Sequence, residues 1–261
     1  MKKYSGRIIE ESKKLRIIDD ALFRLIGTRK EVCQEILRNL LDDDKLIVED
    51  VVIQKTEVSL NRELILDTLC TLGDGSLCNV EMQKSNIFDD LKRVRFHASL
   101  LTANHTPKGT DFKDIPNVKI VYITEYDVLR NGQSVTHVSR CQSDNGIYKP
   151  INDGEDIIFA YARSRQCDKY TYMLNLLLNR DVFYDELYPA LSEAVRHYKV
   201  SENGVSEMCE SIENFAKEYA EEYAEEKIKE IIAEKDAIVA EKDARIAELE
   251  KLLAEKNKDN V

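Results

Sequence analysis

The sequence predicts an α/β fold in which helices flank a mixed sheet and a long helix follows at the C-terminus. Three observations support this. Two strand-like segments flank the turn Gly73-Asp74-Gly75 within residues 63–84. The apolar segment VKIVYIT at residues 118–124 has the length and composition of a strand buried on both faces. Residues 233–253 repeat with a period of seven, which is typical of a coiled-coil helix.

The first forty residues predict two helices. Asp19 or Asp20 is suited to cap a helix over residues 21–27, because a short polar side chain accepts hydrogen bonds from the first backbone N–H groups. Thr28 is suited to cap the next helix, over residues 29–41. The apolar face of that second helix comprises Val32, Ile36, Leu37, Leu40 and Leu41, at helical spacing. Residues 46–60 then predict a first long strand, because they are rich in β-forming side chains.

The glycine turn determines which residues face each other in the predicted hairpin. Both glycines permit the positive φ angles of a tight turn centred on Asp74. Asp67 lies seven residues before this centre and Glu81 lies seven after it. The two carboxylates are therefore expected to be cross-strand partners on one face, with Cβ atoms roughly 5 Å apart. A slip of one residue would place them on opposite faces.

Two directly opposed carboxylates repel each other unless a cation lies between them. Mg²⁺ is commonly held by one or two carboxylates together with waters and phosphate oxygens. Such an ion activates water and stabilises a departing oxygen during phosphodiester hydrolysis. The pair Asp67 and Glu81 is therefore a candidate metal site. The alternative interpretation is a solvated strand face on which each carboxylate points to water.

The next segments complete the predicted sheet. Residues 89–101 predict a helix that carries Lys92, Arg93, Arg95 and His97 beside its apolar stripe. His97 has two interpretations, a proton shuttle or an exposed or capped helix histidine. Three antiparallel strands, a helical crossover and the apolar strand make a mixed sheet. Further along are two more strands and two more helices, at residues 134–141 (after a turn at Asn131-Gly132), 156–161, 168–178 and 187–198.

Charge, hydrophobic segments and cysteine content limit the binding partners and the cellular compartment that the sequence predicts. The net charge is −11, but residues 199–261 hold 10 basic and 18 acidic side chains, so the rest of the chain is nearly neutral. The chain shows no secretory signal pattern and no run of about 18 apolar residues, so neither export nor a membrane span is predicted. Six cysteines without a C-x-x-C pair are typical of reduced thiols, which indicates a cytoplasmic protein.

The C-terminal segment predicts self-association. Ile232, Val239, Ile246 and Leu253 are spaced by seven residues, and Ile231, Ile238 and Leu252 lie beside them. This stripe predicts a coiled coil, and hence a homodimer or higher homo-oligomer, through residues 228–253. The seam is imperfect, because Lys235 and Lys242 stand where a second apolar row is wanted. The alternative is a single solvated helix supported by Glu–Lys pairs.

The order of elements, with an acid on the second strand and E-x-Q on the third, resembles the PD-(D/E)XK nuclease superfold. Within it, the chain resembles the bacterial PD-(D/E)XK family of transposases, also called recombination-promoting nucleases. The likeness covers roughly residues 15–215. The residues and segments that carry it are Asp20 with Phe23, Asp67 in ILDTLC, Glu81-Met82-Gln83, Arg93 and Arg95, FKDIPNVKIVYITEYDVL at 112–129, LYPALSEAVRHYK and GVSEMCE.

The resemblance implies roles for the hairpin residues. Asp67 and Glu81 would bind Mg²⁺, or Mn²⁺, and Gln83 stands where the superfamily usually has lysine. A neutral amide cannot supply the charge of an ammonium, but Gln83 would orient the attacking water by hydrogen bonding. Lys84 is expected to point to the opposite face. The missing positive charge is then expected from the following helix.

Several further positions belong to the implied site. Lys92 or Arg95 is expected to supply that charge, and Lys92, Arg93 and Arg95 are expected to contact DNA phosphates. Asp20 and Glu57 are accessory candidates, although Glu57 is also interpreted as a surface strand carboxylate. The superfamily's Pro-Asp pair is absent, since Leu66 precedes Asp67.

Two functions are consistent with these observations. The first is a Mg²⁺-dependent DNA endonuclease, a hydrolase associated with recombination or transposition. The alternative is a catalytically weak or inactive nuclease-like module that binds DNA or protein and oligomerises through its coiled coil; Gln83 and the acidic balance favour it. The expected organisation is a basic N-terminal arm at 1–15, a nuclease-like domain at 16–200 and a helical tail at 201–261.

Overall fold

The computed structural model describes residues 4–58, 63–84 and 90–258. The chain divides into two compact units, Met1–Ile212 and Glu213–Val261. The first unit contains the sheet and the candidate site, and the second consists of the greater part of one helix. The sequence also predicts a turn and helix cap over residues 86–90, of which residues 86–89 lie outside the described residues.

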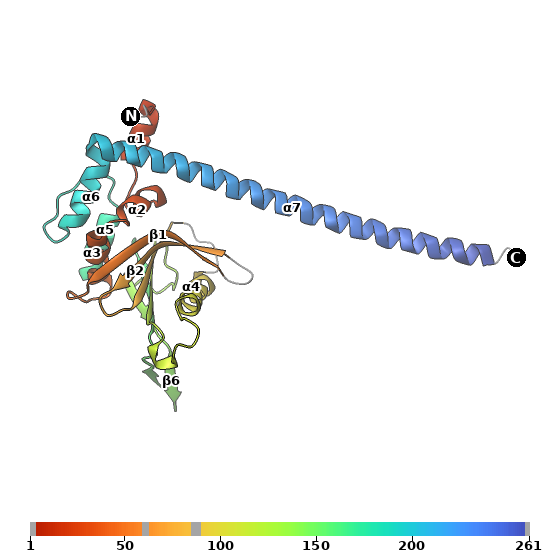
Figure 1. Cartoon of the computed structure of the whole chain (residues 1–261), viewed down its shortest axis with the longest axis horizontal. Helices are drawn as coiled ribbons and strands as arrows, with labels where there is room; N and C mark the ends of the chain where they lie inside the picture. Colours follow the sequence, from red (N-terminus) through yellow and green to blue (C-terminus); the bar gives the residue numbers. More distant parts are fainter. Residues whose placement is uncertain (1–3, 59–62, 85–89, 259–261) are drawn as a thin grey trace. The chain divides into compact units, whose positions relative to one another are not determined.

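A mixed sheet forms the centre of the first unit (Figure 1). Its order in the described residues is β1-β2-β3-β4-β8-β5. The bounds are β1 (Val48–Val58), β2 (Glu63–Leu72), β3 (Leu77–Gln83), β4 (Val118–Thr124), β5 (Val135–Val138) and β8 (Glu155–Tyr161). β1, β2 and β3 are antiparallel, β3, β4 and β8 are parallel, and β5 runs antiparallel to β8. The predicted mixed sheet, with a helical crossover between β3 and β4, is confirmed.

Helices cover both faces of this sheet. The bounds are α1 (Gly6–Lys13), α2 (Asp20–Ile26), α3 (Lys30–Leu40), α4 (Asp90–Asn104), the 3₁₀ helix η1 (Phe112–Asp114), α5 (Lys169–Leu177), α6 (Pro189–Val200) and α7 (Glu202–Lys258). One core joins α2, α3, α5 and α6 to one face, and a second core joins α4 to the other. Figure 1 shows α4 and the α2–α3 pair on opposite sides of β1 and β2.

The burial of both faces of β4 explains why its sequence is largely apolar. Val121 and Ile123 pack in the core beneath α2 and α3, whereas Ile120 and Tyr122 pack in the core beneath α4. Both faces of the strand are therefore buried, as VKIVYIT predicts. β4 lies between β3 and β8, so it carries no free edge.

The predicted register of the β2–β3 hairpin is confirmed. Thr68 pairs with Val80, Leu69 with Asn79 and Cys70 with Cys78. A turn centred on Asp74 requires these pairs, and Gly75 in that turn has a φ of 80°. Asp67 and Glu81 are the next residues outward along the two strands.

The predicted capping hydrogen bonds of two side chains do not form, because each side chain bonds to a residue three positions earlier in the chain. Asp19 stands at the N-cap of α2 but makes no side-chain capping bond there. Its carboxylate accepts instead from the backbone and side chain of Arg16. Thr28 does not cap α3, whose N-cap is Arg29, and its hydroxyl donates to the carbonyl of Leu25.

The C-terminal part of the first unit departs most from expectation. The turn at Asn131-Gly132 was expected to join two paired strands, but β5 pairs with β8 rather than with β4. A separate hairpin, β6 (Cys141–Asp144) and β7 (Ile147–Pro150), was not predicted. Its turn residues Asn145 and Gly146 have φ angles of 48° and 83°, which the Asn-Gly pair signals.

The C-terminal helix α7 extends from Glu202 to Lys258. Its predicted seam residues Ile231, Ile232, Val239 and Ile246 are each exposed by 52–54%. These values are for a single chain without a partner helix, so they do not test the coiled coil, which stays a prediction. No helix in the described part of the chain is long and apolar enough to cross a membrane.

Candidate metal centre

The candidate site lies at the open end of the β2–β3 pair. The backbone N–H of Asp67 donates to Oε1 of Glu81 at 3.3 Å, and the backbone N–H of Met82 donates to Oδ2 of Asp67 at 3.0 Å. Each carboxylate therefore reaches the backbone of the opposite strand. The two side chains meet across the pair, as the register predicts.

One oxygen of each carboxylate is held by the protein. In the described residues, the polar contacts of Glu81 all involve Oε1, which accepts from Asn79 Nδ2 at 2.7 Å and lies 3.5 Å from His97 Nδ1. Oδ2 of Asp67 is held by Met82. Oε2 of Glu81 and Oδ1 of Asp67 are the oxygens that this arrangement offers to a cation. Anchoring of this kind orients metal ligands.

The electrostatics of the pair are unfavourable without a cation. Burial raises the pKa of Asp67 well above its ordinary value, and the negative charges of Glu81 and Asp20 raise it further. The N–H of Met82 and the charge of Arg93 lower the pKa of Asp67 without cancelling these effects. Glu81 itself is only 3% exposed. Like charges brought together in this way are typical of functional sites.

Asp20 contributes a third negative charge from the start of α2. Burial raises its pKa, and the charges of Asp19 and Glu81 act in the same direction, whereas Lys84 and Arg24 oppose them. The structure therefore brings the accessory candidate Asp20 into electrostatic contact with the hairpin pair.

His97 is a buried neighbour of the pair, so the expectation of an exposed helix histidine is wrong. Its ring is fully buried, and Nδ1 lies 3.4 Å from Asn79 Nδ2 as well as near Glu81. Its Nε2 has no hydrogen-bond partner among the described residues. Val94, Ala98 and Leu101 pack α4 against the sheet, and His97 lies on this same helix face.

Arg93, one helical turn before His97, brings positive charge to the pair. Residues four apart share one helix face, so Arg93 faces the sheet together with His97. Its charge acts on Asp67. Lys92 and Arg95 are exposed on α4. The structure thus places Arg93 beside the carboxylates, where Lys92 or Arg95 was expected.

Gln83 and Lys84 lie at the end of β3. Gln83 pairs with Thr124 of β4 and is half-buried. Lys84 was expected to point away from the site. Its Nζ lies 2.9 Å from Oδ1 of Asp19, and its charge acts on the neighbouring Asp20. Lys84 therefore borders the anionic cluster from the side of α2.

Glu57 belongs to a different cluster. It is 4% exposed, so its interpretation as a surface carboxylate is wrong. Asn104 Nδ2 donates to its Oε2 at 2.6 Å, and Lys55 and His105 lie at 2.9 and 3.0 Å from its Oε1. Burial raises the pKa of Glu57, but these hydrogen bonds outweigh it and hold the pKa below its ordinary value. The end of α4 covers this part of β1 and accounts for the burial.

One further side chain of the site was missed, and one strand residue next to the site has an unusual backbone angle. Asn79 precedes Glu81 by two residues, so strand alternation places both on one face, a signal present in the sequence. Gln54 has a φ of 48° and stands opposite Asp67, between the pairs Ile53↔Thr68 and Lys55↔Leu66. A positive φ in a strand residue other than glycine is unusual and has no obvious sequence signal.

The donor set suits a hard divalent cation. Among the described residues, no group of three or more His, Cys, Asp or Glu side chains has the geometry of a metal site. Asp67 and Glu81 supply two carboxylate oxygens, and Mg²⁺ accepts this number when waters and phosphate oxygens complete its shell. Mn²⁺ takes the same oxygen ligands. The residues present therefore fit such an ion.

Comparison with known proteins adds one finding. Residues 19–244 match the family model described as PD-(D/E)XK nuclease family transposase. This range contains every residue of the candidate site. Comparisons with curated proteins and with solved structures found no match.

We expect Asp67→Asn to raise the free energy of unfolding of the metal-free protein by roughly 1–2 kcal/mol near pH 7, because it removes a buried repulsive charge. The folded-state pKa of Asp67 is raised, so the wild type loses stability as pH rises from the unfolded-state pKa through the folded-state pKa. Urea denaturation in EDTA across this pH range measures both effects.

Glu49→Gln is the matched control, because Glu49 is an exposed strand carboxylate. It should leave stability nearly unchanged. Addition of Mg²⁺ should stabilise the wild type and the control but not Asp67→Asn, since only ligand binding to the folded state shifts the equilibrium. A variant less stable than the wild type in EDTA would contradict the repulsion argument.

Proposed function

Because the chain belongs to the PD-(D/E)XK nuclease family transposases, we propose that it is a Mg²⁺-dependent DNA endonuclease that acts in recombination or transposition. The observation that carries the proposal is the opposed pair Asp67 and Glu81. Each carboxylate has one oxygen held by the protein, and the proposal assigns the other oxygen to the cation. Family membership alone indicates a role as a nuclease or in transposition. The pair Asp67 and Glu81 is the reason to propose metal-dependent hydrolysis of a phosphodiester bond.

Each residue has a role in this proposal. Asp67 and Glu81 hold the metal. Asn79 keeps Oε1 of Glu81 fixed through its hydrogen bond, and Nδ1 of His97 lies 3.5 Å from the same oxygen. When bound, Mg²⁺ supplies Lewis-acid stabilisation of the phosphate and a more acidic water. Gln83, half-buried at the end of β3, orients the attacking water through its amide.

The helix α4 supplies positive charge to the reaction. Arg93 faces Asp67 and is placed to stabilise negative charge that develops on the phosphate, because a guanidinium offers several N–H donors to phosphate oxygens. Lys92 and Arg95 are exposed and contact more distant phosphates of the DNA. Asp20 strengthens the field that attracts the cation from the side of α2.

A binding module without catalysis is the second candidate. Gln83 in place of lysine and the net charge of −11 favour it. Such a module would retain DNA affinity that falls with salt and would show no cleavage dependent on metal.

The C-terminal helix is proposed to bring two copies together through residues 228–253. The half-exposed seam residues Ile232, Val239 and Ile246 support this, since a partner helix would bury them. Two copies provide two sites, which suits cleavage of both DNA strands. The cysteines are free thiols, consistent with the proposed location in the cytoplasm.

Plasmid nicking tests the proposed chemistry. Wild-type protein with Mg²⁺ should cleave, and Asp67→Ala and Glu81→Ala should reduce cleavage to background because each removes a metal ligand. Glu49→Ala is the matched control and should cleave like the wild type. No cleavage by folded wild type with Mg²⁺ or Mn²⁺ would favour the binding module. Equal cleavage by all four proteins would place the activity elsewhere.

Sedimentation equilibrium tests the proposed association. The double variant Ile232→Lys and Val239→Lys should shift the protein from dimer to monomer, because it places charge in the apolar seam. The double variant Ala237→Lys and Ala240→Lys adds the same charge at exposed positions beside the seam and should stay dimeric. Identical masses for both variants would contradict association through this stripe.

A further inference from the structure

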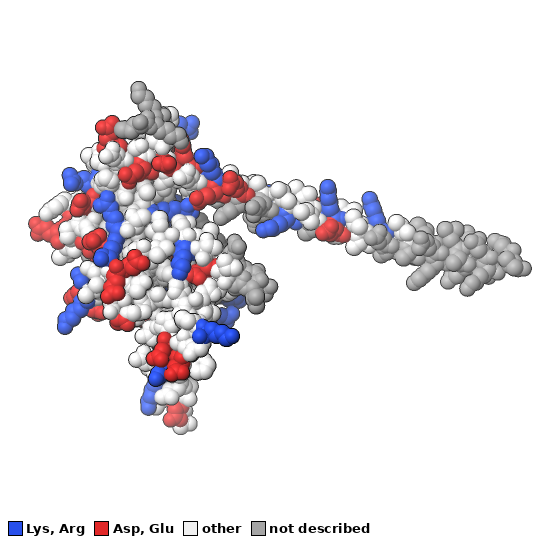
Figure 2. All heavy atoms as spheres, in the orientation of Figure 1, with Lys and Arg blue, Asp and Glu red and all other residues white. Residues whose placement is uncertain are grey.

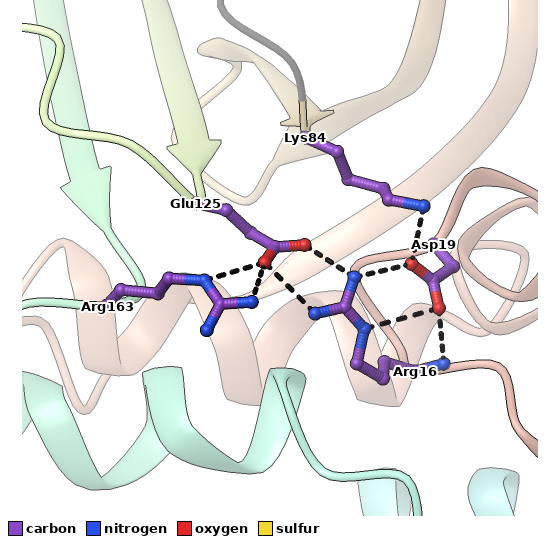
Figure 3. A network of polar contacts seen from close by, with 5 residues as sticks. All are labelled: Arg16, Asp19, Lys84, Glu125 and Arg163. Carbon is purple, nitrogen blue, oxygen red and sulfur yellow. Dashed lines mark hydrogen bonds and ion pairs between the residues drawn. The ribbon is translucent and has the colours of Figure 1, made fainter.

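A network of five charged side chains lies at the ends of the parallel strands (Figure 3). Arg16 is its centre: Nη2 lies 2.9 Å from Oδ1 of Asp19 and 2.5 Å from Oε1 of Glu125. Lys84 binds Asp19 at 2.9 Å, and Nε of Arg163 donates to Oε2 of Glu125 at 2.8 Å. Three cations therefore surround two carboxylates, and the network carries one net positive charge.

The network is polarised between the interior and the solvent. The carboxylates of Asp19 and Glu125 are 9% and 10% exposed, and the guanidinium side chain of Arg16 is 12% exposed. Lys84 and Arg163 are 44% and 54% exposed. The negative charges thus lie inside, and the two outer cations present the excess positive charge to solvent.

The two outer cations are oriented rather than loosely placed. Arg163 binds Glu125 through Nε and Nη2, so the plane of its guanidinium is defined. Lys84 is held by a buried oxygen of Asp19. A guanidinium has five N–H donors and an ammonium has three, so these contacts use only part of their capacity. Pre-oriented donors lose less entropy when they bind phosphate.

The network borders the candidate metal centre. Lys84 directly follows Gln83, and the backbone N–H of Glu125 donates to the carbonyl of Gln83 at 3.3 Å. Arg163 lies just past the end of β8, the parallel neighbour of β4. The two outer cations thus lie at the C-terminal ends of β3 and β8, and Lys84 at the end of β3 is the nearer of them to Glu81 in the chain.

Charge on the rest of this unit is mixed. On the face shown in Figure 2, basic and acidic side chains of the first unit are interspersed. Phosphate recognition there depends on individual cations with a defined orientation more than on a broad basic field. The network supplies two such cations on the side of the site away from α4.

We propose that Lys84 and Arg163 form a phosphate clamp that binds phosphodiester groups of the DNA strand flanking the scissile bond. The proposal rests on the proposed function, since it assigns DNA as the ligand, and it adds a contact surface on the α2 side of the centre. Arg16 has a structural role, because its guanidinium bridges the two carboxylates, Asp19 and Glu125.

The salt dependence of DNA binding tests the clamp. Fluorescence anisotropy with a labelled duplex in EDTA gives the slope of log Kobs against log salt concentration. Lys84→Gln and Arg163→Gln should each reduce the steepness of this slope by roughly 0.9, and the double variant by roughly twice that, since each removes one phosphate contact. The loss of affinity should be uniform across duplex sequences.

Lys113→Gln is the matched control, because Lys113 is an exposed cation on η1, with a side chain that is 77% exposed. It should keep the slope of the wild type. Unchanged slopes for Lys84→Gln and Arg163→Gln would overturn the clamp while leaving the proposed function intact. Absence of duplex binding by the wild type would overturn the proposed function itself, together with the clamp that depends on it.

Thermal unfolding separates the clamp from a structural role. Each outer variant leaves its carboxylate paired with Arg16, so Tm should fall by less than about 3 °C. Arg16→Gln leaves two buried carboxylates undercompensated and should lower Tm by roughly 5–10 °C. Outer variants that destabilise as much as Arg16→Gln would assign their side chains to folding rather than to DNA.

Discussion

The repulsion between Asp67 and Glu81 is the constraint on which the structure of the site depends. The hairpin places two carboxylates opposite each other, and burial removes the water that would screen them. The surrounding residues hold this arrangement rather than relieve it: Met82 and Asn79 each fix one oxygen. Asp20 adds negative charge to the same region. A divalent cation is the partner that makes such a cluster favourable.

The helices on the two faces of the sheet make different contacts around Asp67 and Glu81. α4 packs on one face and carries His97 and Arg93 toward the carboxylates. On the opposite face, the start of α2 is tied to the strand ends by Arg16, whose guanidinium joins Asp19 to Glu125. The first contribution supports the two carboxylates that are proposed to bind the metal, and the second secures the edge where DNA is proposed to bind. Stability lost at the carboxylate pair is offset by the cores on both faces of the sheet.

The sequence predicted the parts of the fold that local pattern determines. The turn at Asp74 and period-two alternation were sufficient for the hairpin register, and an apolar run of strand length was sufficient for β4. The burial of His97 and Glu57 was not predictable, because it depends on how α4 crosses the sheet. Asp19 stands at the predicted N-cap but makes no capping bond, because the nearby Arg16 binds its carboxylate. The β6–β7 hairpin was missed although Asn145-Gly146 signals its turn.

Anomalous diffraction from crystals of the full chain soaked in Mn²⁺ tests the central claim most directly. Mn²⁺ accepts the same oxygen ligands as Mg²⁺ and its position is visible at suitable wavelengths. The account predicts a peak between Oδ1 of Asp67 and Oε2 of Glu81, with Oε1 of Glu81 still held by Asn79. A peak at other side chains, with the pair unoccupied at saturating Mn²⁺, would contradict the assignment of these two carboxylates as the metal ligands.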